Sequence, residues 1–183
     1  ITILVALTIV FVPVVSDAAP LNKVAVIVLG VTEPRGDIYN DVFREELEKK
    51  FPPQQYVIVT GEASHNVWRK YWDAKGLLNE PADIKRDDLV QFSKSVEAEF
   101  SRVLYVNITR LSINDRTASW QWNTFTYPTA TAEIRFLLFD TSTASILADK
   151  NVVQSGAEGD NGAIQMAKKS ALRRSLREFS QSK

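Results

Sequence analysis

Four aromatic side chains crowd one short stretch in the second half of the chain: Trp120, Trp122, Phe125 and Tyr127. If this stretch forms a strand, Trp120 and Trp122 point to one face, together with the threonines that alternate with Phe125. Indole rings beside hydroxyl groups occur on half-buried sheets and on surfaces that bind glycans or peptides, and Trp is enriched at interaction hot spots. We therefore expect a core or helix-covered sheet face at these residues by default, and the alternative, which makes Trp120, Trp122, Phe125 and Tyr127 the candidate binding residues, is an exposed aromatic surface for a partner.

Residues that could carry out nucleophilic or acid–base catalysis are scarce. His65 is the only histidine, and Glu62 and Ser64 lie too near it in sequence to form a triad. The chain has no Cys, which excludes a thiol nucleophile, a thiolate zinc site and disulfides. We therefore expect a protein without catalytic residues. The alternative is an enzyme that hydrolyses a cell-wall polymer with two carboxylates about 5–9.5 Å apart and the tryptophans as a sugar platform.

Two further patterns could be taken for ligand sites. Gly156, Gly159 and Gly162 precede the last helix, but the G-K-[ST] ending of a phosphate-binding loop is missing and acidic residues lie between them. The aspartates at 83–88 do not have the spacing of a calcium-binding loop and instead suit the start of a helix. We therefore predict no cofactor and no metal.

Residues 1–18, ITILVALTIVFVPVVSDA, have the composition of a secretory signal peptide. They carry no Lys or Arg and end in small residues, whereas a spanning helix needs roughly 20 apolar residues. We predict a signal peptide truncated at its N-terminus at 1–18, a single globular domain at 19–183, and a periplasmic or secreted location. A retained membrane anchor is the alternative, and without Cys we expect no lipid attachment of the bacterial lipoprotein kind.

The charges are balanced. The chain has 22 basic and 22 acidic residues, so it lacks the concentrated positive field that nucleic acids require. Its fractions of hydrophobic residues, 45%, and charged residues, 24%, are those of a folded globular protein. We therefore expect no nucleic-acid partner.

The first half of the chain predicts a parallel strand–helix–strand unit. Residues 24–30, VAVIVLG, are apolar throughout, which is typical of a strand buried on both faces. A helix capped by Asp37 follows, with Glu46 among the charged residues on its solvent side, and a second strand lies at 56–59. Two further helices come next, and we expect Trp68 and Trp72 in the first of them to pack in the core.

The second half predicts an antiparallel meander and a closing helix. We expect strands at 103–109, 132–140 and 146–153, a turn at 113–116, and an alternating stretch through the tryptophans. In the last helix, the residues expected to face inward are Ile164, Ala167, Ala171, Leu172, Leu176 and Phe179. Those expected on a solvated stripe are Lys169, Arg173 and Arg177. The predicted fold is α/β, with α+β character: a single mixed sheet in which a parallel βαβ unit precedes an antiparallel meander and a helix packed on the sheet.

The order of these elements resembles a group of exported bacterial domains. The features that carry the resemblance are the VAVIVLG strand, the strand Arg102-Val103-Leu104-Tyr105-Val106-Asn107-Ile108, the later strand Ala132-Glu133-Ile134-Arg135-Phe136-Leu137-Leu138-Phe139-Asp140, and the closing Ala/Leu/Arg helix. This pattern is similar to the TolB N-terminal domain, the curli secretion lipoprotein CsgG and the lipoproteins that activate penicillin-binding proteins. The resemblance implies an envelope location, and it transfers no functional residues.

These observations together predict an exported, non-catalytic cell-envelope protein. We expect it to bind a protein partner, or a second copy of itself, during envelope biogenesis or secretion. After cleavage of the signal peptide we expect no stable membrane span, and a homo-oligomer is compatible with the pattern. The alternative is a protein that binds or hydrolyses a cell-wall glycan through carboxylates and an aromatic platform.

Overall fold

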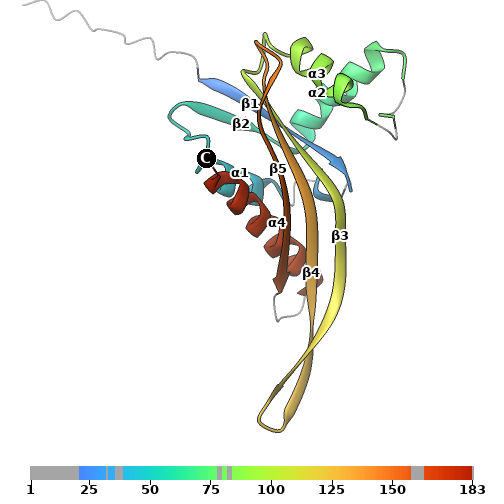
Figure 1. Cartoon of the computed structure of the whole chain (residues 1–183), viewed down its shortest axis with the longest axis vertical. Coiled ribbons are helices and arrows are strands. Elements are labelled where there is room, and N and C mark those ends of the chain that lie inside the picture. Colours follow the sequence, from blue (N-terminus) through green and yellow to red (C-terminus); the bar gives the residue numbers. More distant parts are fainter. Residues whose placement is uncertain are drawn as a thin grey trace, which may run out of the picture.

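The computed structural model describes residues 21–31, 33–35, 39–77, 80–81, 84–157 and 163–182. These residues form one five-stranded sheet in the order β2-β1-β3-β4-β5 (Figure 1). The strands are β1 (Asn22–Gly30), β2 (Tyr56–Val59), β3 (Arg102–Trp120), β4 (Asn123–Asp140) and β5 (Ser145–Ala157). The helices are η1 (Glu33–Arg35), α1 (Asn40–Leu47), α2 (Gly61–Ala74), α3 (Arg86–Ser95) and α4 (Ala163–Gln181). The predicted signal peptide at 1–18 and the predicted cap Asp37 lie outside the described residues.

β1 lies at the centre of the parallel half of the sheet. It pairs in parallel with β2 on one side and with β3 on the other, whereas β3, β4 and β5 are antiparallel, so the predicted mixed sheet is confirmed. The side chains of β1 alternate between two apolar cores, with Val24, Val26 and Val28 in the first and Ala25, Ile27 and Leu29 in the second. A strand buried on both faces requires helices on both faces of the sheet.

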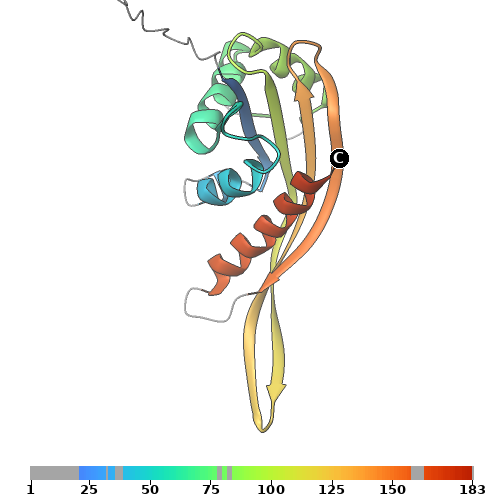
Figure 2. The same ribbon diagram turned by 90° about the vertical axis from the view of Figure 1, so that its left-hand side faces the viewer.

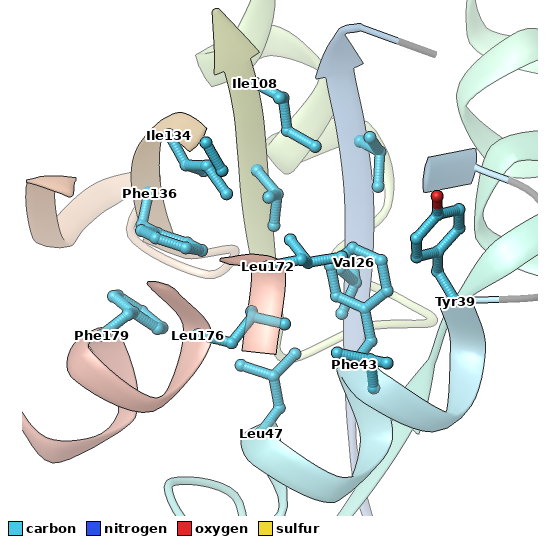
Figure 3. Close-up of a cluster of buried hydrophobic side chains, with 14 of the residues drawn as sticks. Val26, Tyr39, Phe43, Leu47, Ile108, Ile134, Phe136, Leu172, Leu176 and Phe179 are labelled. Atoms are coloured by element: carbon cyan, nitrogen blue, oxygen red, sulfur yellow. The ribbon is translucent and has the colours of Figure 1, made fainter. Parts of the chain in front are cut away.

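Helices cover the two faces in pairs. α1 and α4 contribute to the first core, in which Phe43, Leu47, Leu176 and Phe179 surround the strand side chains (Figure 3). α2 and α3 contribute to the second core. The Trp68 and Trp72 side chains there are 0% and 3% exposed, which confirms their predicted role in the core.

The antiparallel half has three long strands where the sequence predicts four shorter ones. The predicted turn at 113–116 is wrong, because these residues lie within β3 and pair with residues 127–130 of β4. Asn and Asp at the centre of this segment favour turns locally, but pairing along a whole partner strand outweighs that preference. The chain reverses later, at Gln121 and Trp122, where Gln121 has a φ of +54°.

β3 and β4 extend beyond the rest of the sheet. β1 stops pairing with β3 at Ile108, and β5 stops pairing with β4 at Thr129. Residues 115–128 therefore form a two-stranded ribbon, the hairpin arm, which projects past the end of α4 (Figure 2). A bulge between Ile108 and Arg110 interrupts the β3–β4 register at the end of β1, and such bulges increase the local twist.

α4 packs along β4 and β5 on the first face of the sheet (Figure 2). Of its six residues expected to face inward, five are buried: Ala167, Ala171, Leu172, Leu176 and Phe179. The prediction is wrong for Ile164, which is 52% exposed because it lies in the first turn, before the buried stretch begins. At Gly156 the backbone of β5 approaches the helix so closely that a Cβ would lie 2.4 Å from the Ala171 nitrogen.

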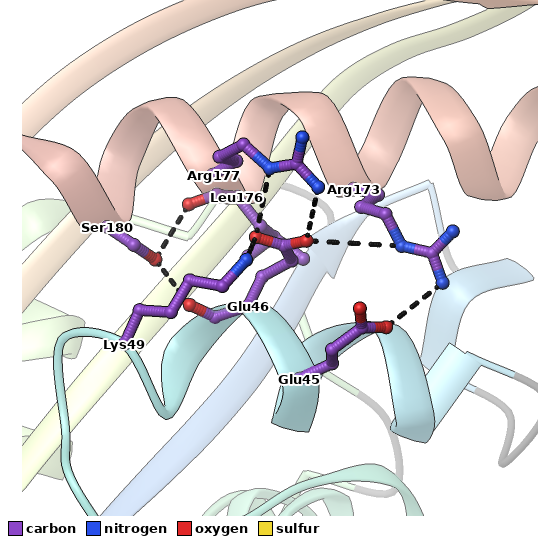
Figure 4. Close-up of polar contacts among 7 residues, drawn as sticks. All are labelled: Glu45, Glu46, Lys49, Arg173, Leu176, Arg177 and Ser180. Carbon is purple, nitrogen blue, oxygen red and sulfur yellow. Dashed lines mark hydrogen bonds and ion pairs between the residues drawn. The ribbon is translucent and has the colours of Figure 1, made fainter.

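α1 and α4 meet at a buried carboxylate, contrary to the sequence prediction. Glu46 was expected on the solvent side of α1, but its side chain is 0% exposed and points toward α4 (Figure 4). Arg177, expected on a solvated stripe, donates hydrogen bonds to Glu46 at 3.0 and 3.4 Å, and Lys49 donates another. Arg173 pairs with Glu45 at 3.1 Å. The prediction is wrong because helical periodicity shows only which residues of α1 share a face. It does not indicate that α4, from the other end of the chain, packs against the charged face and pairs with Glu46.

The contacts of Glu46 keep it ionised. Burial alone raises the pKa of its carboxyl group, but the hydrogen bonds from Arg177 and Lys49 outweigh burial and hold the pKa below its usual value. The carboxylate is therefore a negatively charged link between two helices that are far apart in the sequence.

Candidate binding site

The structure places the four predicted binding residues at the outer end of the hairpin arm. Trp120 is the last residue of β3, where it pairs with Asn123. Trp122 lies in the turn and is 99% exposed, Phe125 is 49% exposed, and Tyr127 is half-buried. Because Trp122 is a turn residue, the prediction that both tryptophans point to one strand face is wrong.

The two faces of the hairpin arm differ in chemistry. One face carries hydroxyl groups that meet across the strands, Thr117 with Thr126 at 3.4 Å and Ser119 with Thr124 at 3.3 Å. Phe125 and Tyr127 alternate with the threonines of β4, so they point to the opposite face. Their ring centroids are 6.5 Å apart and their planes are inclined by 38°. The structure thus brings Phe125 and Tyr127 together and separates them from the threonines.

Both edges of the hairpin arm are unpaired in the described part of the chain. Beyond Ile108 no described strand pairs with β3 on its outer side, and beyond Thr129 none pairs with β4 on its outer side. Unpaired N–H and C=O groups along a strand edge can accept an added strand. The sequence is compatible with an exposed sheet edge that pairs with a second copy, but it does not locate that edge, although the alternation of Thr with aromatic residues through 124–127 is the signal of a strand whose two faces differ.

The hairpin arm has no core of its own. An isolated two-stranded ribbon is at best marginally stable in water, and here only its inner end continues into the larger sheet. Its exposed rings therefore contribute little to the fold, which leaves them available for intermolecular contacts.

His65 lies in the second turn of α2 and is half-buried. Burial, followed by the nearby charge of Arg35, lowers the pKa of its imidazole. Across the residues that the structure describes, no side chain hydrogen-bonds to His65, and no group of three or more His, Asp or Glu side chains is arranged to hold a metal ion. None of the helices in the described part of the chain is both long and apolar enough to cross a membrane.

No known protein family matches the chain, and no curated protein matches it. Among solved structures, the fold is similar to lipoprotein GNA1162 from Neisseria meningitidis, with a TM-score of 0.44, 14% identity, and coverage of 89% of this chain and 100% of that one. It is similar to the hypothetical protein CT253 from Chlamydia trachomatis, with a TM-score of 0.43, 14% identity, and coverage of 87% and 94%.

A third similar structure is the PelC dodecamer from Paraburkholderia phytofirmans, with a TM-score of 0.41, 12% identity, and coverage of 89% of this chain and 87% of that one. These proteins come from bacteria, and one of the three is named as a lipoprotein. At this level of identity no residue role and no activity is transferred from them to this chain.

Proposed function

We propose that this chain is an exported, non-catalytic cell-envelope protein whose hairpin arm binds a protein partner during envelope assembly or secretion. The observation that supports this most directly is the exposure of Trp122, 99%, and Phe125, 49%, on a ribbon that lies outside both cores. The signal-peptide pattern at 1–18 and the resemblance to the TolB, CsgG and penicillin-binding-protein-activator group support the envelope location.

The unpaired edges favour a protein partner over a glycan. An extended protein segment can form main-chain hydrogen bonds with a strand edge while its side chains contact the rings, whereas a sugar uses only the rings and hydroxyl groups. Trp122 in the turn and the inclined Phe125–Tyr127 pair do not form one flat stacking platform. The same edges could accept a second copy of the chain, which would give a homo-oligomer.

The decisive experiment measures binding to a partner identified by affinity capture from envelope extracts and then purified. The double variant Trp122→Ala, Phe125→Ala should weaken that binding by about 30-fold, the effect of losing one hot spot of about 2 kcal/mol. Val153→Ala is the matched control, because Val153 is 61% exposed on β5 but lies outside the hairpin arm.

The thermal melts of both variants should match that of the parent, since exposed side chains contribute little to stability. Unchanged partner binding by the double variant would refute the proposal. Binding of soluble cell-wall fragments that is lost with the same two rings would instead support the glycan alternative, and mass measurement across concentrations would detect self-association.

A further inference from the structure

A cavity of about 290 Å³ opens on the second face of the sheet, beside the start of α3. It lies at the carboxyl end of β1, next to β3. From β1 the chain goes to β2 on one side of this point, and from β3 it goes to β4 on the other side, so the strand order changes direction here. In open α/β sheets this change of direction leaves a crevice, and ligands bind in such crevices. The cavity volume is close to the lower end of the usual range for small-molecule sites.

The floor of this cavity is apolar. Leu29 of β1, Leu137 and Phe139 of β4 and Leu89 of α3 line it. Gly30 forms part of the wall with a φ of +74°, and a Cβ there would lie 2.4 Å from the Ile108 carbonyl oxygen and 3.0 Å from Asn107 Oδ1. Any larger residue at position 30 would therefore push the wall of the cavity apart.

Three polar side chains lie around the apolar floor: Arg86, Asn107 and Arg135. Arg86 is exposed, and neither it nor the Asn107 side chain has a hydrogen-bond or ion-pair partner among the described residues. Arg135 donates to Asp149 through Nε at 2.9 Å and Nη2 at 2.7 Å, which leaves Nη1 available. The hydrogen bonds from Arg135, and then the charge of Arg86, hold the pKa of Asp149 below its usual value.

Among the described side chains at the cavity, the charges therefore do not cancel. Asp149 is ionised at neutral pH and neutralises one of the two guanidinium groups, so the described groups leave one positive charge. A cationic rim over an apolar floor complements a molecule with an anionic head and an apolar body. The free amide of Asn107 can add a hydrogen bond to the same head.

We propose that this cavity binds a small organic anion, a carboxylate or phosphate ester on a short apolar body. Its head contacts Arg86, Asn107 and Nη1 of Arg135, and its body lies on Leu89, Leu137 and Phe139. This site is separate from the hairpin arm and does not depend on the function proposed for that arm.

The test is calorimetric titration of the purified protein with octanoate, octanol and inorganic phosphate. Octanoate should bind saturably, and octanol, which has the same tail without the charge, should bind about tenfold more weakly or not at all. Inorganic phosphate, which lacks the apolar body, should also bind much more weakly than octanoate. Equal binding of octanoate and octanol would overturn the proposal.

Variants then locate the site. Arg86→Gln should weaken octanoate binding by about tenfold while leaving the thermal melt nearly unchanged, because Arg86 is exposed and no described side chain forms a hydrogen bond or ion pair with it. Arg116→Gln is the control, since Arg116 is also an exposed arginine and lies on the distant hairpin arm. Octanoate binding that is insensitive to Arg86→Gln refutes the site. Sedimentation with phosphatidylglycerol vesicles that requires Arg86, without any binding of octanoate, assigns the anion to a membrane surface and refutes the small-molecule site.

Discussion

Replacing Glu46 by Gln tests whether the buried carboxylate links α1 to α4. Glu46 accepts hydrogen bonds from Arg177 and Lys49, and Gln keeps the size and one acceptor oxygen but removes the charge. Hydrogen bonds to charged groups contribute about 1.5–3 kcal/mol each, and losing one partner of a fully buried pair costs about 3–5 kcal/mol. The side chains of Arg177 and Lys49 are 49% and 46% exposed, so both cations regain water.

Glu46→Gln should therefore lower the free energy of unfolding by about 2 kcal/mol, within the range for one hydrogen bond to a charged group and below the cost of breaking a fully buried pair. For a domain of this length that corresponds to a decrease in Tm of about 4–8 °C. Glu45→Gln is the matched control, because Glu45 is the preceding residue in α1, pairs with Arg173 and is 57% exposed. A surface pair of this kind contributes about 0–1 kcal/mol.

The effect should depend on pH in a defined direction. The pKa of Glu46 is lower in the folded protein than its usual value of 4.5, so the folded state favours the ionised form. The resulting stability is fully present above the unfolded-chain pKa of about 4.3 and is lost as the pH falls through the folded pKa. The difference in unfolding free energy between the parent and Glu46→Gln should thus be constant near neutrality and shrink below about pH 4.5.

Urea denaturation followed by far-UV circular dichroism, at several pH values between 3 and 7, measures this difference directly. The interpretation fails if Glu46→Gln and Glu45→Gln are equally destabilising, or if the gap between the parent and Glu46→Gln widens as the pH falls.

Three further predictions concern the core, α4 and the hairpin arm. In urea melts, Trp68→Ala should lower the free energy of unfolding by about 3–5 kcal/mol because the indole is fully buried, whereas Trp122→Ala should lower it by less than about 0.5 kcal/mol. Similar losses for the two variants would contradict the assigned burial. Gly156→Ala should lower the free energy of unfolding more than Gly76→Ala, since a Cβ at Gly156 overlaps the backbone of α4. A Cβ at Gly76 has open space, so that variant should lose only the backbone term of about 1–2 kcal/mol that comes from its φ of +79°. In hydrogen-exchange mass spectrometry, amides at 115–128 should exchange faster than those at 103–107, and equal protection would show that the hairpin arm is packed in solution.

The sequence predicts the parallel half of the fold well because its signals are local. The apolar run of β1 identifies a strand covered on both faces, and the positions of Trp68 and Trp72 four residues apart identify a buried helix face. Five of the six inward residues of α4 follow from the same periodicity.

The errors arise where partners distant in sequence decide the outcome. Asn114 and Asp115 resemble turn residues, and only their pairing with β4 keeps them extended. The real reversal at Gln121 and Trp122 has none of the Gly or Asn-Gly combinations that mark two-residue hairpin turns. Glu46 is charged and so was assigned to solvent, whereas the arginines that permit its burial come from α4.

The candidate site was predicted in composition but not in geometry. The aromatic residues at 120–127 were identified from their types alone, but the two-residue turn moves Trp122 away from the strand faces. The cavity beside α3 has no sequence signal, because Arg86, Asn107 and Arg135 come from three separate elements.

The continuity of β3 has a mechanical consequence. This strand runs from the end of the hairpin arm to the centre of the sheet, where residues 102–108 pair with residues 24–30 of β1. A pull on the arm along its length acts roughly at right angles to the hydrogen bonds between these strands. All of them then resist sliding at the same time, whereas a sideways pull opens a ladder one bond after another. The arm is therefore anchored in the part of the domain that is buried on both faces, and a partner that holds its tip would pull on the core in its most resistant direction.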